Sequence, residues 1–170
     1  MNLYMDYRFS PNFKLDHINQ ENVIEAFKER IDHHYIKPIE ILNCMKLGFA
    51  ATILISSFID ILAKTENHNT TKESKDNYIN LLIRDLGFDD SSADLFYYNF
   101  RCGLIHAGCI ESGGQISYKQ SVPYQIYHGY LSVNPCELFE KIKKKFENFI
   151  DQEKPEELFK YLKTKIKEIK

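Results

Sequence analysis

Tryptophan is absent from this 170-residue chain, and glycine, proline and cysteine are scarce, with seven, five and four residues. Cysteines so few and so scattered do not predict a disulfide-rich secreted scaffold. Because no signal-peptide pattern is visible, we expect reduced thiols in a cytoplasmic protein. No apolar run is both uncharged and long enough for a clear membrane span, since the nearest, Leu47 to Leu62, is short and contains Asp60. An excess of positive charge is also missing, because the formal net charge is −2. A nucleic-acid role would therefore need a local basic cleft.

The periodicity of apolar residues predicts a mainly helical protein. Helical spacing covers residues 20–35, 39–64, 75–86, 135–150 and 156–170. A further helix, before residue 135, is expected to open at the cap-like Asp90-Ser91-Ser92 and to end near Gly108. Pro38 suits the first turn of the second of these helices, which is the most apolar and so belongs at the centre of a bundle. Residues 115–119 and 124–133 alternate as strands do, which predicts a β-hairpin with Pro123 near its turn.

We therefore expect a mainly all-α fold, a helical bundle with a β-hairpin inserted after the helix that ends near residue 108. The chain is long enough for one domain, 1–170, with a sizeable core. Its expected parts are an aromatic N-terminal arm (1–19), four helices (20–107), the hairpin (108–134) and two C-terminal helices (135–170). The arm is expected to pack its rings on the body or on a second subunit.

The densest group of reactive side chains lies between Asp94 and Cys109, in the sequence DLFYYNFRCGLIHAGC. Arg101 and His106 interrupt an otherwise apolar and aromatic run, where neither is expected without a partner. The run is typical of a helix that stops near Gly108. On an ideal α-helix, Arg101 and His106 would point about 140° apart. They would share one site only through the reach of arginine, a kink at Gly103 or a second subunit.

The sequence from Arg101 to His106 resembles the signature of the HEPN superfamily, an arginine followed after four to six residues by a histidine on the third main helix of a helical bundle. This resemblance extends loosely from Glu21 to Ile150. It implies a metal-independent endoribonuclease without a cofactor, in which His106 moves protons and Arg101 stabilises the charge on phosphorus. It further implies a cyclic phosphate product, an RNA or nucleotide ligand, a homodimer, and a setting in phage defence or a toxin–antitoxin pair with an antitoxin as partner.

Three further residues are expected to support this site. Asp60, a lone carboxylate in an apolar helix, is the candidate partner of Arg101, as in the family, although it could equally be exposed. Asn99 and Cys102 lie close to His106 on a helical projection. Cys102 stands where the family often has Asn or Asp, which favours a non-catalytic HEPN-like module that binds RNA, a nucleotide or a protein.

Other interpretations of the same residues remain open. Arg101 could form a structural ion pair with Asp60 or Asp94 in a helical scaffold. Cys102, His106 and Cys109, spaced i, i+4 and i+7, could bind zinc with Cys136 or His128, although the usual paired cysteines are missing.

Two groups elsewhere could touch a nucleic acid. The basic run of residues 141–145 and the lysines of 160–170 could follow a phosphate backbone or form a solvated helix face. Several aromatic and histidine side chains could stack on bases or simply pack on the bundle. These are His33, His34, Tyr97, Tyr98, Tyr118, Tyr124, Tyr127 and Tyr130.

Overall fold

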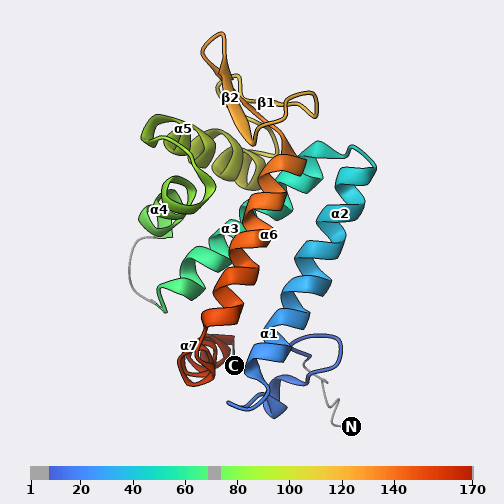
Figure 1. The fold of residues 1–170 in the computed structure, drawn as a ribbon, viewed down its shortest axis with the longest axis vertical. Coiled ribbons are helices and arrows are strands. Elements are labelled where there is room, and N and C mark those ends of the chain that lie inside the picture. Colours follow the sequence, from blue (N-terminus) through green and yellow to red (C-terminus); the bar gives the residue numbers. More distant parts are fainter. Residues whose placement is uncertain (1–7, 69–73, 170) are drawn as a thin grey trace.

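The computed structural model describes residues 8–68 and 74–169, and shows a helical bundle with a small three-stranded sheet at one end (Figure 1). The expected mainly all-α fold with a hairpin insert is therefore confirmed. The principal helices are α1 (Val23–Ile31), α2 (Lys37–Cys44), α3 (Gly48–Glu66), α4 (Ser74–Leu86), α5 (Asp90–Leu95), α6 (Pro135–Gln152) and α7 (Pro155–Ile169). A 3₁₀ turn, η1 (Leu15–His17), precedes them, and two wide π-helical segments interrupt them, η2 (Asp32–Ile36) and η3 (Phe96–Ala107).

Helix α3 lies at the centre of the bundle, where it packs against α2, α4, α6 and η3 (Figure 1). Its side chains Ile55, Phe58 and Ile59 are fully buried, and the ring of Phe58 meets that of Phe146 on α6 at 5.6 Å. By length and composition α3 could cross a membrane. However, 56% of its apolar window is buried inside the fold, as expected for the core helix that its composition predicts.

The expected place of Pro38 in the first turn of a second helix is confirmed, since α2 begins at Lys37. The gap expected before that helix is wrong, because residues 23–44 are one continuous helical rod, in which η2 joins α1 to α2. At this junction Lys37 N–H bonds the carbonyl of Asp32, five residues back, as in a π-helix. The chain breaks instead at residues 45–47, where Lys46 has a left-handed φ of 57°, so the helix predicted over 39–64 is two helices.

The inserted sheet has the strand order β1-β3-β2, with β1 (Gln115–Ile116), β2 (Tyr124–Tyr127) and β3 (Tyr130–Val133). Strands β2 and β3 form the hairpin, and β1 pairs with β3 in parallel. The hairpin turn is His128–Gly129, both with positive φ, as two-residue hairpin loops require. The turn predicted near Pro123 is therefore wrong, since Pro123 lies just before β2.

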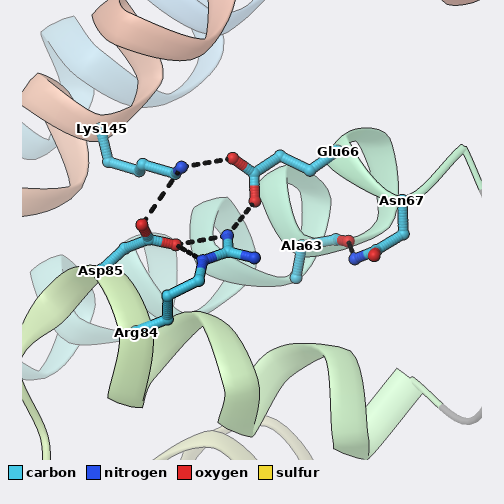
Figure 2. Close-up of polar contacts among 6 residues, drawn as sticks. All are labelled: Ala63, Glu66, Asn67, Arg84, Asp85 and Lys145. Carbon is cyan, nitrogen blue, oxygen red and sulfur yellow. Dashed lines mark hydrogen bonds and ion pairs between the residues drawn. The ribbon is translucent and has the colours of Figure 1, made fainter.

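A network of ion pairs ties together the far ends of three helices (Figure 2). Lys145 of α6 lies 2.6 Å from Glu66 of α3 and 3.3 Å from Asp85 of α4, while Arg84 contacts the same two carboxylates. Near the N-terminus, the described part of the arm packs on the body, because Phe9 is buried and Arg30 of α1 covers its ring. Residues 1–7 of the predicted arm lie outside the described residues.

Candidate functional site

The helix that carries the site begins at a well-formed cap. The carboxylate of Asp89 accepts hydrogen bonds from the backbone N–H of Ser92 and from the hydroxyls of Ser91 and Ser92. These bonds, with one from Tyr124, hold the pKa of Asp89 well below its usual range. α5 follows and continues without interruption into η3, which ends at Gly108 with a left-handed φ of 68°. The helix stop expected near Gly108 is confirmed.

The π-helical winding of η3 brings Arg101 and His106 together. In this winding each N–H bonds the carbonyl five residues back, so side chains five apart lie roughly one turn above each other. The N–H of Gly108 makes such a bond to the carbonyl of Gly103. Nη1 of Arg101 lies 3.2 Å from Nε2 of His106. The separation of about 140° expected for an α-helix is therefore wrong for this segment.

The contact between Arg101 and His106 is a hydrogen bond in one tautomer of the imidazole. Arginine has only donors, so Nη1 of Arg101 donates and Nε2 of His106 accepts. Nε2 is then unprotonated, and the proton of the neutral ring lies on Nδ1. His106 is exposed to solvent, whereas only 17% of the Arg101 side chain is exposed. The pair thus presents a basic nitrogen beside a cation at the protein surface.

Three neighbours hold the guanidinium of Arg101. Asp60 of α3 lies 3.5 Å from Nη2, the ring of Tyr97 lies 5.5 Å below the guanidinium carbon, and Sγ of Cys102 lies 4.0 Å from Nη1. Burial opposes the charge, but the contacts with Cys102 and Asp60 outweigh it and raise the pKa of Arg101, which stays a cation. Burial also raises the pKa of Tyr97. The buried Nε of Arg101 has no hydrogen-bond partner, so the guanidinium retains unused donor capacity.

The structure brings two of the three supporting residues to the motif. Asp60 contacts Arg101, and its closer partner is Lys64 at 2.9 Å, one helical turn further on. Cys102 contacts Arg101 directly. Asn99 is buried, and its backbone carbonyl accepts a hydrogen bond from the N–H of Glu111, which fastens the chain after η3 onto the helix.

Asp94, the other carboxylate considered for Arg101, faces Lys75 instead, at 3.3 Å. Lys75 also donates to the hydroxyl of Tyr98 at 2.8 Å, and this bond raises the pKa of Lys75. Tyr98 is 52% exposed and meets Tyr97 edge-on, which places an exposed ring one step from the Arg101 site. The contacts of Tyr97 with Arg101 and of Lys64 with Asp60 were not predicted. In each pair the two residues are four apart, a spacing that a helix brings together.

The zinc arrangement considered above is not assembled. Within residues 8–68 and 74–169, the one group of three potential ligands close enough for a metal is His68, Glu153 and Glu157. No feature of the sequence indicated this group, because His68 lies 85 residues before Glu153 and meets the two glutamates only through the bundle.

Most of the other predicted contact residues have structural partners. The ammonium group of Lys141 donates to the carbonyl of Leu86, and that of Lys143 pairs with Glu40. Lys145 pairs with both Glu66 and Asp85. These contacts favour the structural interpretation of the basic run.

Among the aromatic and histidine residues, Tyr118 donates to Asn43 and Tyr124 stacks on Phe88 at 4.1 Å. His33 and His34 pack edge-on against each other. Tyr127 and Tyr130, in contrast, are 58% and 46% exposed on the hairpin. The hairpin tyrosines therefore divide into two that pack on the bundle and two that face outward.

Comparison of the chain with protein-family models, with curated proteins and with solved structures found no match.

Proposed function

We propose that this protein is a metal-independent endoribonuclease of HEPN type, with Arg101 and His106 as its catalytic residues. One observation carries the proposal: the guanidinium and the imidazole meet at 3.2 Å, and the imidazole is exposed to solvent. A permanent cation beside a neutral imidazole suits a phosphodiester, because one group stabilises negative charge while the other moves a proton.

The proposed reaction is an internal transesterification of RNA. A phosphate oxygen takes over Nη1 of Arg101 and thereby releases Nε2 of His106. Nε2 removes the proton of the ribose 2′-hydroxyl, the 2′-oxygen forms a bond to phosphorus, and the bond from phosphorus to the 5′-oxygen breaks. The departing 5′-oxygen then receives this proton from the imidazolium of His106, leaving a 2′,3′-cyclic phosphate, a free 5′-hydroxyl and a neutral imidazole.

The neighbours of Arg101 support its role by holding it in place. Asp60 and the ring of Tyr97 restrict the guanidinium, so that less conformational entropy is lost when phosphate binds. Further parts of the proposal rest on the resemblance alone. They are a homodimer whose two motifs share one cleft, an antitoxin or other protein partner, a role in phage defence, and a cytoplasmic location.

A second candidate is a non-catalytic module that binds RNA, a nucleotide or a protein through the same residues. It is favoured by Cys102, which contacts Arg101 in the position where the family often has Asn or Asp. Such a module would use Arg101 as an anion contact, without proton transfer by His106.

The test measures cleavage of an end-labelled RNA by purified protein in the presence of EDTA. We expect Arg101→Ala and His106→Ala to lower the rate about 10²- to 10⁴-fold while remaining folded. His128→Asn is the matched control, because it removes an exposed imidazole from a left-handed turn position that Asn tolerates.

An RNA with a 2′-deoxyribose at the cleaved position should resist the wild-type enzyme. Binding of RNA without cleavage, weakened by Arg101→Ala but not by His106→Ala, would establish the second candidate instead.

A further inference from the structure

A second cluster of titratable side chains lies at the opposite end of α3 from the sheet. His68 follows the C-terminus of α3, Glu153 caps the end of α6, and Glu157 lies in the first turn of α7. The three side chains meet at the edge of a hollow of about 460 Å³, which Asn67, Asn148 and Gln152 also line. The cluster therefore joins the end of α3 to α6 and α7, which follow each other much later in the sequence.

Both nitrogens of the His68 ring face carboxylates. Nε2 lies 2.8 Å from Glu153 and Nδ1 lies 3.8 Å from Glu157. One ligand atom from each of the three residues falls within 4.8 Å of the others. Neighbouring ligand atoms around a tetrahedral zinc ion lie about 3.3 Å apart, so side-chain movements of an ångström or so bring this set to coordination distance.

The cluster sets two carboxylates against a single histidine. The Glu153 side chain is only 8% exposed. A buried carboxylate in this setting is stabilised by a cation.

We propose that His68, Glu153 and Glu157 bind a divalent transition-metal ion, with Zn²⁺ as the best match. One imidazole nitrogen and two carboxylate oxygens are ligands that zinc accepts, and three protein ligands leave a position for water. Lys154 now lies 3.1 Å from Glu157, but its side chain is 66% exposed and can turn into solvent when the metal binds. The bound ion joins the end of α3 to the corner between α6 and α7.

The site is separate from Arg101 and His106, so it does not depend on the proposed nuclease. Zinc binding is measured by isothermal titration calorimetry and by thermal unfolding of full-length protein freed of metal with a chelator. For the wild type we expect one Zn²⁺ per chain and a higher unfolding temperature with Zn²⁺ than with EDTA. Mg²⁺ should not reproduce the shift, because it prefers octahedral sites made of oxygen.

His68→Gln, Glu153→Gln and Glu157→Gln should each weaken Zn²⁺ binding at least tenfold. Glu156→Gln is the matched control, since it removes the same charge from the same turn of α7 outside the cluster, and it should bind like the wild type. Equal Zn²⁺ affinity in the wild type and Glu153→Gln, or an equal loss in Glu156→Gln, would overturn the proposal. If His68→Gln fails to fold, Glu157→Gln decides, because its side chain is 49% exposed and its loss is tolerable.

Discussion

Arg101 and His106 touch, Nη1 to Nε2 at 3.2 Å, because the helix between them is wound more widely than an α-helix. The contact needs neither a kinked helix nor a second subunit. Aromatic rings line the same segment, with Phe96 and Phe100 stacked at 5.3 Å on its buried side. The winding, the core packing and the candidate site are therefore parts of one arrangement, and disturbing the backbone should disturb the site.

Gly103→Ala is expected to destabilise the protein by about 1–3 kcal/mol, measured by urea denaturation. An added Cβ would lie 2.6 Å from the carbonyl oxygen of Cys109, so the backbone after η3 must shift. The shift should also change the NMR resonances of the His106 ring, which the His106→Gln spectrum identifies.

Gly129→Ala serves as the control for this variant. It carries the strain of a positive φ of 82° but has no atom near the added Cβ. It should lose about 1–2 kcal/mol and leave the His106 resonances in place. Unchanged His106 resonances in Gly103→Ala would show that the winding does not position the ring.

Asp60→Asn is expected to cost roughly 1–2 kcal/mol, between the values for exposed and buried ion pairs. The Asp60 and Arg101 side chains are only 18% and 17% exposed, so the neutral amide leaves a largely buried guanidinium without its carboxylate. Lys64→Gln removes the other cationic partner of Asp60. Because the Lys64 side chain is 40% exposed, this change should lower the free energy of unfolding by less than about 0.5 kcal/mol. If Asp60→Asn and Lys64→Gln lowered the free energy of unfolding in urea equally, the ion pair with Lys64, and not that with Arg101, would account for the effect of Asp60.

The cap at Asp89 predicts an acid-sensitive component of stability. Its pKa is lowered in the folded state, so on acidification the unfolded chain takes up the proton first. The stabilisation is complete above the unfolded pKa of about 3.9 and is lost as pH falls further. Asp89→Ala should therefore show a flatter decline of unfolding free energy between about pH 5 and 2 than the wild type. Asp90→Ala, outside these hydrogen bonds, should decline like the wild type.

Lys145→Met is expected to destabilise the protein by roughly 1–2 kcal/mol, because Glu66 and Asp85 are only 13% and 17% exposed and would repel each other without it. Arg84 cannot compensate fully, since its side chain is 58% exposed and screened by solvent (Figure 2). The exposed Lys144→Met is the matched control and should change stability by less than about 0.5 kcal/mol. Denaturation at low and high salt should show a smaller salt effect in Lys145→Met.

Residue patterns predicted the fold where the pattern is local. The apolar face of α6, the central place of α3 and the stop at Gly108 follow from periodicity, composition and helix-stop chemistry. The turn at His128–Gly129 was missed because His-Gly is not one of the usual pairs of a two-residue hairpin turn, which are Asn-Gly, Asp-Gly and Gly-Gly. Pro38 was expected in the first turn of a second helix and lies there, but η2 joins that helix to α1 without a gap.

The candidate site was predicted in its residues but not in its geometry. Arg101, His106 and Asp60 stand out as polar residues in apolar segments, and the structure brings them together. The winding of η3 has no counterpart in the sequence, since the same residue types form ordinary α-helices elsewhere. The cluster around His68 escaped notice because only tertiary packing assembles it.

The π-helical winding of η3 also constrains how the motif can change in length. Side chains four apart already share a face on an ordinary α-helix, whereas those five apart do not. Deleting one residue between Arg101 and His106 should therefore keep their contact only if the segment tightens to an α-helix. The stacked rings of Phe96 and Phe100 would then have to rotate with the helix. In this helix, the count of residues in the motif and the pitch of the backbone must change together.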